Sequence, residues 1–225
     1  MTEQRNNIIL LNGPPASGKD VIAEKILSIV DREIMDLQIQ AYHMQFKKRL
    51  FDIALSITGI NSDVWFERYG NRKLKEEPWD RLPINYTYRD VFDGDLVEVR
   101  HTQRTWLVEV SENIIKPRLG LRFFGDAAAQ KIIEDQSCDI MKLSGWGHLH
   151  VFSDSGFSDE VIPLADIPNT DIHLIQLYRD GCSFAGDSRR YLDDSNKYAT
   201  FHDICNDGTI EQAAREILNI TNIYC

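Results

Sequence analysis

The sequence predicts an α/β protein with a parallel sheet, helices on both faces and three layers in all. An apolar run at residues 8–11, rich in β-branched side chains, is typical of a buried parallel strand. Strand-like and helix-like segments then alternate along the chain, which favours parallel strands joined by helices. The first strand and first helix are joined by "GPPASGKD" at residues 13–20, which has the spacing of a phosphate-binding loop.

The first half of the chain supports these elements in order. Apolar side chains recur at helical spacing from Val21 to Val30, so a helix follows the loop. Residues 37–44 alternate as a strand, and residues 46–59 are helical up to a terminal glycine. Residues 71–104 are charged and interrupted by prolines and a turn signal, and predict a mobile insertion. Helical spacing resumes over 103–119 and 122–136, with Pro117 near a helix start.

The second half of the chain predicts three more strands. Thr209 and Gln212 have the spacing of a capping box at the start of the last helix. A polar, glycine-containing loop precedes the last strand. In chain order we expect a strand at 148–154, a helix at 157–167, a strand at 171–180, the loop at about 180–198, a strand at 200–208 and a helix at 209–220.

Length and composition indicate one globular domain, residues 1–225, because the chain suffices for one large core. The insertion is expected at about 42–140 and a lid loop at about 180–198. A net charge of -10 disfavours a broad nucleic-acid surface and favours small-molecule ligands. The four scattered cysteines, the polar start and the lack of a long apolar stretch predict a cytoplasmic protein that does not bind membranes.

The loop at residues 13–20 predicts a P-loop NTPase core. Backbone N–H groups of Gly13, Ala16, Ser17, Gly18 and Lys19 can line one anion site, helped by the positive end of the following helix. The Lys19 amine would reach the outer phosphates of ATP. Asp20 occupies the position where the usual pattern has serine or threonine, and its carboxylate is a suitable ligand for Mg²⁺.

Other charged residues are candidates for the transfer chemistry. Asp154 ends a predicted strand, where it could bind Mg²⁺, accept a proton from a hydroxyl acceptor, or begin a simple turn. Arg179 and Arg189 flank or lie in the predicted lid and are candidates for contact with the transferring phosphoryl group. Three further cations are acceptor-binding candidates, although each could also be a solvated surface charge: Lys48, Lys75 and Arg104.

Five stretches in this order resemble the deoxynucleoside monophosphate kinases of bacteriophages. The stretches are "SGKD" at residues 17–20, "KEEP" at 75–78, Arg104 before an amphipathic helix, "VFSDSGFSDE" at 151–160 and "NDGTIEQ" at 206–212. The resemblance covers most of the chain and implies a P-loop kinase with ATP and Mg²⁺, a helical acceptor-binding insertion and a lid. It also implies that Asn206 lies in the ATP site. Gly156 stands where the family pattern has an arginine, which leaves the acceptor open.

The sequence therefore predicts an ATP-dependent kinase that phosphorylates a small nucleotide, most simply a deoxynucleoside monophosphate, in a host cell if the protein is viral. One alternative is phosphorylation of the hydroxyl of 5-hydroxymethylpyrimidine in DNA, with DNA as the partner. A second alternative is a regulatory module that binds ATP and has no acceptor. A homodimer is also left open.

Overall fold

The computed structural model describes residues 6–33, 38–90, 94–136, 147–187, 189–193 and 197–223. The chain divides into two compact units. The first unit comprises Met1–Phe46 and Arg122–Cys225, and the second comprises Lys47–Leu121. The second unit is thus inserted in the first, within the range of about 42–140 expected for an insertion.

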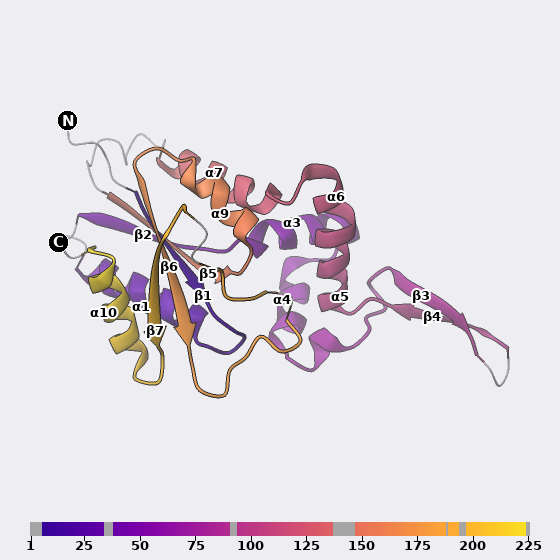
Figure 1. Cartoon of the computed structure of the whole chain (residues 1–225). Helices are drawn as coiled ribbons and strands as arrows, with labels where there is room; N and C mark the ends of the chain where they lie inside the picture. The colour runs from indigo at the N-terminus through magenta and orange to yellow at the C-terminus, as the bar shows by residue number, and fades with distance from the viewer. Residues whose placement is uncertain are drawn as a thin grey trace. The chain divides into compact units, whose positions relative to one another are not determined.

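A five-stranded parallel sheet forms the centre of the first unit (Figure 1), which confirms the predicted α/β class. The strand order is β2-β5-β1-β6-β7, so β1 is central. Because the chain leaves β1 for β2 on one side and later reaches β6 on the other, the connections reverse direction across β1. Ligands of open α/β sheets bind at the carboxyl ends of strands beside such a reversal. The strands are β1 (Asn6–Asn12), β2 (Ile39–Met44), β5 (Gly147–Ser155), β6 (Thr170–Tyr178) and β7 (Thr200–Cys205).

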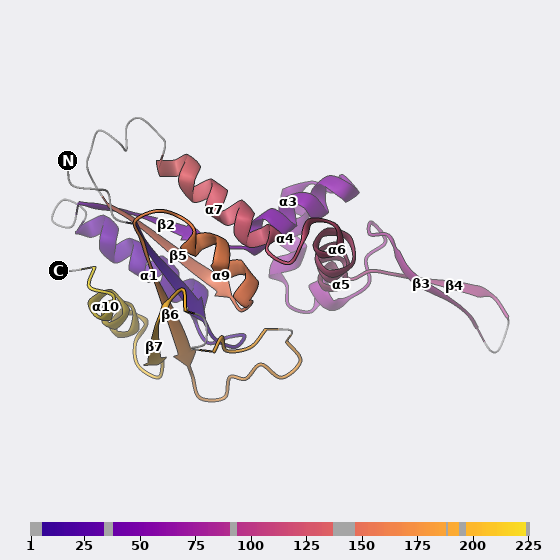
Figure 2. The same cartoon turned by 45° about the horizontal axis from the view of Figure 1, so that its top comes forward.

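Helices cover both faces of this sheet, as predicted (Figures 1 and 2). On one face, Ile22 and Ile26 of the first helix and Ile217 of the last form a core with alternate side chains of the strands, such as Ile9 and Leu149. The capping box of the last helix, Thr209 with Gln212, is confirmed. The helices are α1 (Lys19–Arg32) and α10 (Ile210–Ile220) on that face, and α7 (Phe123–Gln136) and α9 (Ser158–Ala165) on the other.

Strand β5 places two histidines on the face opposite Leu149. His148 and His150 are fully buried, and their rings stack with centroids 6.2 Å apart. The Tyr42 ring of β2 stacks on His150 at 5.0 Å. Neither ring nitrogen of either histidine has a hydrogen-bond partner in the described part of the chain. Burial lowers the pKa of both, to about 4 for His150.

The second unit is mainly helical, but it also contains an antiparallel hairpin that was not predicted within the charged segment at 71–104. The hairpin forms because alternate side chains of the two strands lie on the same face. Tyr86 pairs there with Val99, and Tyr88 with Val97. Trp65 and Trp106 are buried among the helices. The elements are α3 (Lys47–Thr58), α4 (Ser62–Gly70), η1 (Leu74–Glu76), β3 (Ile84–Arg89), β4 (Leu96–Arg100), α5 (Gln103–Val108), the π-helical turn η2 (Glu109–Ile115) and α6 (Lys116–Leu119).

Within the described ranges, no helix has both the length and the apolar character that a membrane span requires. Residues 179–187 and 189–193 form no regular element, as predicted for the loop after β6. Pro117 lies in the first turn of α6, close to the predicted helix start.

Candidate functional site

The loop between β1 and α1 requires glycine at two positions. Gly18 has a φ of 96°, in the left-handed region that other residues rarely adopt. A Cβ atom on Gly18 would lie 2.8 Å from the side-chain nitrogen of Asn206. A Cβ atom on Gly13 would lie 2.8 Å from Ser17 Oγ and 2.9 Å from the carbonyl oxygen of Leu177. The loop is therefore a tight turn that leads directly into the positive end of α1.

Lys19 is the first residue of α1 and is only 7% exposed. Its Nζ donates hydrogen bonds to the carbonyl oxygens of Gly13 at 2.6 Å and Pro14 at 2.7 Å. The positive charge is thus held beside the backbone of the loop that was predicted to bind phosphate. Because the lysine side chain is flexible, the amine can turn from these carbonyls to an anion in the loop.

Asp20 belongs to a hydrogen-bonded group that joins α1 to the ends of β2 and β5. Its Oδ1 accepts hydrogen bonds from Ser153 Oγ at 2.6 Å and from Gln45 Nε2 at 3.2 Å. His43 Nε2 lies 2.8 Å from the same Ser153 hydroxyl. These contacts orient the carboxylate at the carboxyl edge of the sheet, beside the loop.

Asp154 is buried near the carboxyl end of β5, as predicted. Its Oδ1 accepts a hydrogen bond from the Phe46 backbone N–H at 3.0 Å. Within the described ranges, no group of three or more His, Cys, Asp or Glu side chains is arranged to hold a metal ion. Mg²⁺ usually keeps several waters and needs only one or two protein carboxylates besides substrate phosphates. The oxygen donors of Asp20 and Asp154 suit that requirement.

The loop after β6 is attached to the end of β1 by Asn12, which is fully buried. Asn12 Oδ1 accepts from the Leu192 N–H at 2.8 Å, and its Nδ2 donates to the carbonyl oxygens of Arg190 at 3.1 Å and Ser155 at 3.2 Å. The Tyr191 hydroxyl donates to the carbonyl oxygen of Leu177 at 2.9 Å. The predicted lid thus has a fixed base at residues 190–192.

The two arginines predicted for the transfer step have different surroundings. Arg179 is exposed, and its Nη1 donates to the carbonyl oxygen of Ala16 at 3.4 Å, so it reaches the loop. Arg189 donates from Nε and Nη2 to the two carboxylate oxygens of Asp187, at 2.9 and 2.8 Å. These hydrogen bonds raise the pKa of Arg189 above its ordinary value, and its charge also interacts with Asp154. The Arg189 stem packs on Gly156, where a Cβ would lie 2.6 Å from Cγ.

Asn206, predicted for the ATP site, is buried and contacts the loop backbone. Its Nδ2 donates to the carbonyl oxygen of Ser17 at 2.8 Å. Its Oδ1 is buried and has no hydrogen-bond partner among the described residues. The structure therefore gives Asn206 a role in holding the loop, next to the φ of 96° at Gly18.

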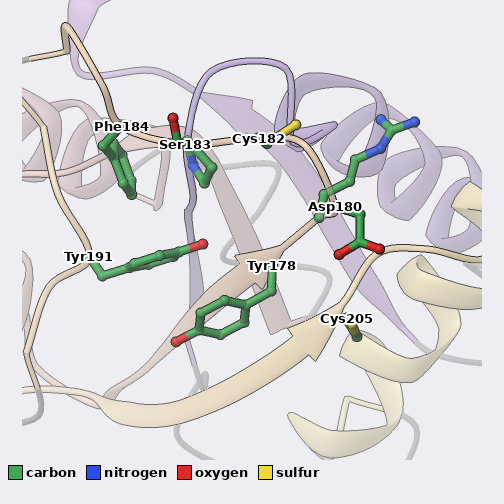
Figure 3. Close-up of a pocket in the computed structure, with 9 residues that line it drawn as sticks. Tyr178, Asp180, Cys182, Ser183, Phe184, Tyr191 and Cys205 are labelled. Carbon is green, nitrogen blue, oxygen red and sulfur yellow. The ribbon is translucent and has the colours of Figure 1, made fainter.

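A pocket of about 360 Å³ lies beside the loop (Figure 3). Pro14 of the loop and Arg179 belong to its wall. In Figure 3 the rings of Tyr178, Phe184 and Tyr191 lie toward one end, and Asp180 and Cys205 lie toward the other. The Tyr191 ring is 4.7 Å from that of Tyr178 and 5.0 Å from that of Phe184, measured between centroids. Such an aromatic wall suits a planar ligand group.

The predicted acceptor-binding residues all lie in the second unit. Lys48 is exposed on α3. Arg104 Nη1 lies 3.4 Å from Glu76 Oε1, and Lys75 Nζ lies 5.2 Å from the centroid of the Tyr69 ring. Two of the three thus meet around η1, which contains the first two residues of the "KEEP" stretch.

Four residues that position the site through hydrogen bonds were not predicted: Asn12, His43, Gln45 and Ser153. Their partners lie 25 to 180 residues away in the chain, so local spacing carries no signal of these contacts. Only Ser153 had an indirect signal, since it precedes Asp154 at the end of a predicted strand.

A scan against family models and a search of curated proteins found no match to this chain.

Proposed function

We propose that this chain is a P-loop kinase that transfers the γ-phosphoryl group of ATP to a deoxynucleotide, most simply a deoxynucleoside monophosphate. One observation carries the proposal. A turn with obligatory glycines at 13 and 18, and a buried lysine at its end, joins the central strand of a parallel sheet to a helix N-terminus. This combination provides N–H donors, a helix dipole and an ammonium group for a polyphosphate.

In this proposal the residues of the loop bind the β- and γ-phosphates, and Lys19 donates to the oxygen atoms on which charge builds up during transfer. Bound Mg²⁺ would neutralise negative charge on the phosphates. Asp20 and Asp154 would hold it, and the hydrogen bonds from Ser153 and Gln45 keep Asp20 oriented for this task.

The aromatic pocket beside Pro14 is the proposed place for the base of ATP. Its wall reaches from the loop to Tyr178 and Tyr191, so one ligand could occupy the loop and the pocket together. Arg179 already contacts the loop at Ala16 and is the better placed of the two arginines to meet a phosphate there. Arg189 would have to exchange its two hydrogen bonds with Asp187 before it could do the same.

The nature of the acceptor decides which chemistry Asp154 performs. A monophosphate is already an anionic nucleophile and needs only to be held in line with the γ-phosphate. A hydroxyl, as in 5-hydroxymethylpyrimidine of DNA, needs a base, and the carboxylate of Asp154 at the sheet edge could accept its proton. This second candidate is favoured by Gly156, which stands where the resembling monophosphate kinases have an arginine.

The test is an acceptor screen with ATP labelled on the γ-phosphate, Mg²⁺ and the full chain. Each deoxynucleoside monophosphate and a duplex that contains 5-hydroxymethylpyrimidine are offered separately. We expect the label to appear on one of the monophosphates. Label on the DNA alone would favour the second candidate, and ATP binding without transfer to any acceptor would favour a regulatory module.

A further inference from the structure

The second unit contains a pocket of about 420 Å³ that none of the predicted residues lines. It lies between α4, η1 and the segment at 79–81. Val64 and Leu74 give it apolar walls, and Trp79 contributes its indole. Two guanidinium groups, those of Arg68 and Arg81, also line it.

Both arginines are positioned by the indole of Trp79. Arg68 Cζ lies 5.1 Å and Arg81 Cζ lies 5.9 Å from the ring centroid, within the range of cation–π attraction. Arg68 Nη2 also donates to the carbonyl oxygens of Glu77 at 3.3 Å and Pro78 at 3.5 Å. These contacts fix the Arg68 guanidinium before any ligand arrives, which lowers the entropic cost of binding.

Two cations near the pocket pair with carboxylates, whereas the two arginines that line it do not. Arg104 pairs with Glu76, and Lys73 pairs with Glu77 at 3.7 Å. Within the described ranges, neither Arg68 nor Arg81 makes an ion pair with a carboxylate. Arg68 Nε is buried without a hydrogen-bond acceptor there, which is unfavourable until an acceptor arrives. Two guanidinium groups without a carboxylate partner thus line the pocket together with the single carboxylate of Glu67, so the lining favours an anionic ligand group.

The remaining polar groups suit a heterocycle attached to that anion. Asn71 Oδ1 accepts from the backbone N–H groups of Lys73 and Leu74, so its amide NH₂ is the group left to donate. Glu67 supplies a carboxylate acceptor on the same wall. An anion, a planar group with donors and acceptors, and apolar contact together describe a nucleoside phosphate.

We propose that this pocket binds a nucleoside phosphate. Arg68 and Arg81 would contact its phosphate, and Asn71 and Glu67 would form hydrogen bonds with its base. Its role as the acceptor site rests on the proposed kinase function, but its ligand class does not. The phosphate can belong to a free monophosphate or to a nucleotide within a DNA strand.

The test measures binding to the full chain without ATP, by calorimetry, for each deoxynucleoside monophosphate and for a single-stranded oligonucleotide. Arg81→Ala, at an exposed side chain, is expected to weaken binding of one of these probes by about 10-fold or more. Arg68→Lys keeps the charge but loses the planar fork, and should weaken it similarly. Arg118→Ala is the control, because this exposed arginine of α6 does not line the pocket.

If Arg81→Ala weakens the binding of monophosphates alone, the ligand is a free nucleotide. If it weakens the binding of the oligonucleotide alone, the ligand is DNA. If both variants bind the probes like the unaltered protein, or if the unaltered protein binds no probe, the proposal that this pocket binds a nucleoside phosphate is wrong. The kinase proposal is tested apart from this, because it requires ATP binding that depends on Lys19. Either proposal can therefore fail while the other stands.

Discussion

Gly18 carries two constraints at once, a left-handed backbone and a neighbouring amide nitrogen 2.8 Å from where a Cβ would be. Gly18→Ala should therefore lower the free energy of unfolding by about 2–3 kcal/mol. Gly59→Ala is the matched control, because Gly59 has a φ of 66° and open space around it. That control should cost only about 1 kcal/mol. Urea denaturation of both variants checks this, and equal costs would contradict the close approach of Asn206.

The sequence could predict the site residues whose role depends on neighbouring positions, but not those whose role depends on contacts between distant segments. Lys19 and Asp20 follow from the spacing of one short segment, because backbone geometry and charge are local there. Ser153 could not be assigned to Asp20, since their contact spans 133 residues and depends on the strand order. Asn206 was predicted as a ligand contact, but its bond to the Ser17 carbonyl is visible only when β7 is placed.

At the scale of elements, β5 makes the sheet sensitive to acid. His150 has a pKa of about 4 in the folded chain because it is buried, against an ordinary value of 6.5. Between these values the unfolded chain binds a proton that the folded chain does not, so stability falls as pH falls from about 6.5 to about 4. The loss reaches about 3 kcal/mol, on an order-of-magnitude scale.

His150→Phe should reduce this pH dependence, because a phenyl ring can keep the stacking with Tyr42 and does not titrate, while His148 remains and also has a pKa lowered by burial. Urea unfolding of the variant and of the unaltered protein at several pH values between 7 and 4 provides the measurement. Equal slopes for the two proteins would show that His150 is not the group responsible.

The loop after β6 depends on Asn12 for its base. Asn12→Ala removes the side-chain hydrogen bonds to the Leu192 N–H and to two carbonyl oxygens, of which two bonds are buried and one is partly buried. We expect a loss of about 2–3 kcal/mol in unfolding free energy and faster amide hydrogen exchange at residues 190–192. Tyr191→Phe, which removes only one hydroxyl bond to Leu177, serves as the milder comparison. Unchanged exchange in Asn12→Ala would mean that the loop is held by other contacts.

Elements with strong periodicity were predicted well, and the hairpin was not. Helix α10 has an apolar stripe and a capping box that are both local signals. In β3 and β4 the alternation is equally local, but the prolines and charges between 71 and 104 favour an irregular segment. The pairing of Tyr86 with Val99 depends on the two strands meeting, which composition cannot show.

At the scale of the molecule, the candidates divide between the two units. The loop residues, Asp20, Asp154, Arg179 and Arg189 belong to the first unit, and Lys48, Lys75 and Arg104 belong to the second. The pocket at Trp79 lies wholly within the second unit as well. A kinase needs one site for ATP and another for its acceptor, and this division is consistent with one site in each unit.

The most direct test of the central claim compares Lys19→Ala with Lys25→Ala in assays of ATP binding and of phosphoryl transfer. Lys25 lies on the same helix and pairs with Glu211 at 3.2 Å, so its loss removes an equal charge away from the loop. We expect Lys19→Ala to reduce transfer by at least about 100-fold and Lys25→Ala to leave it within about twofold. If Lys19→Ala binds and consumes ATP like the unaltered protein, residues 13–19 are not a phosphate site.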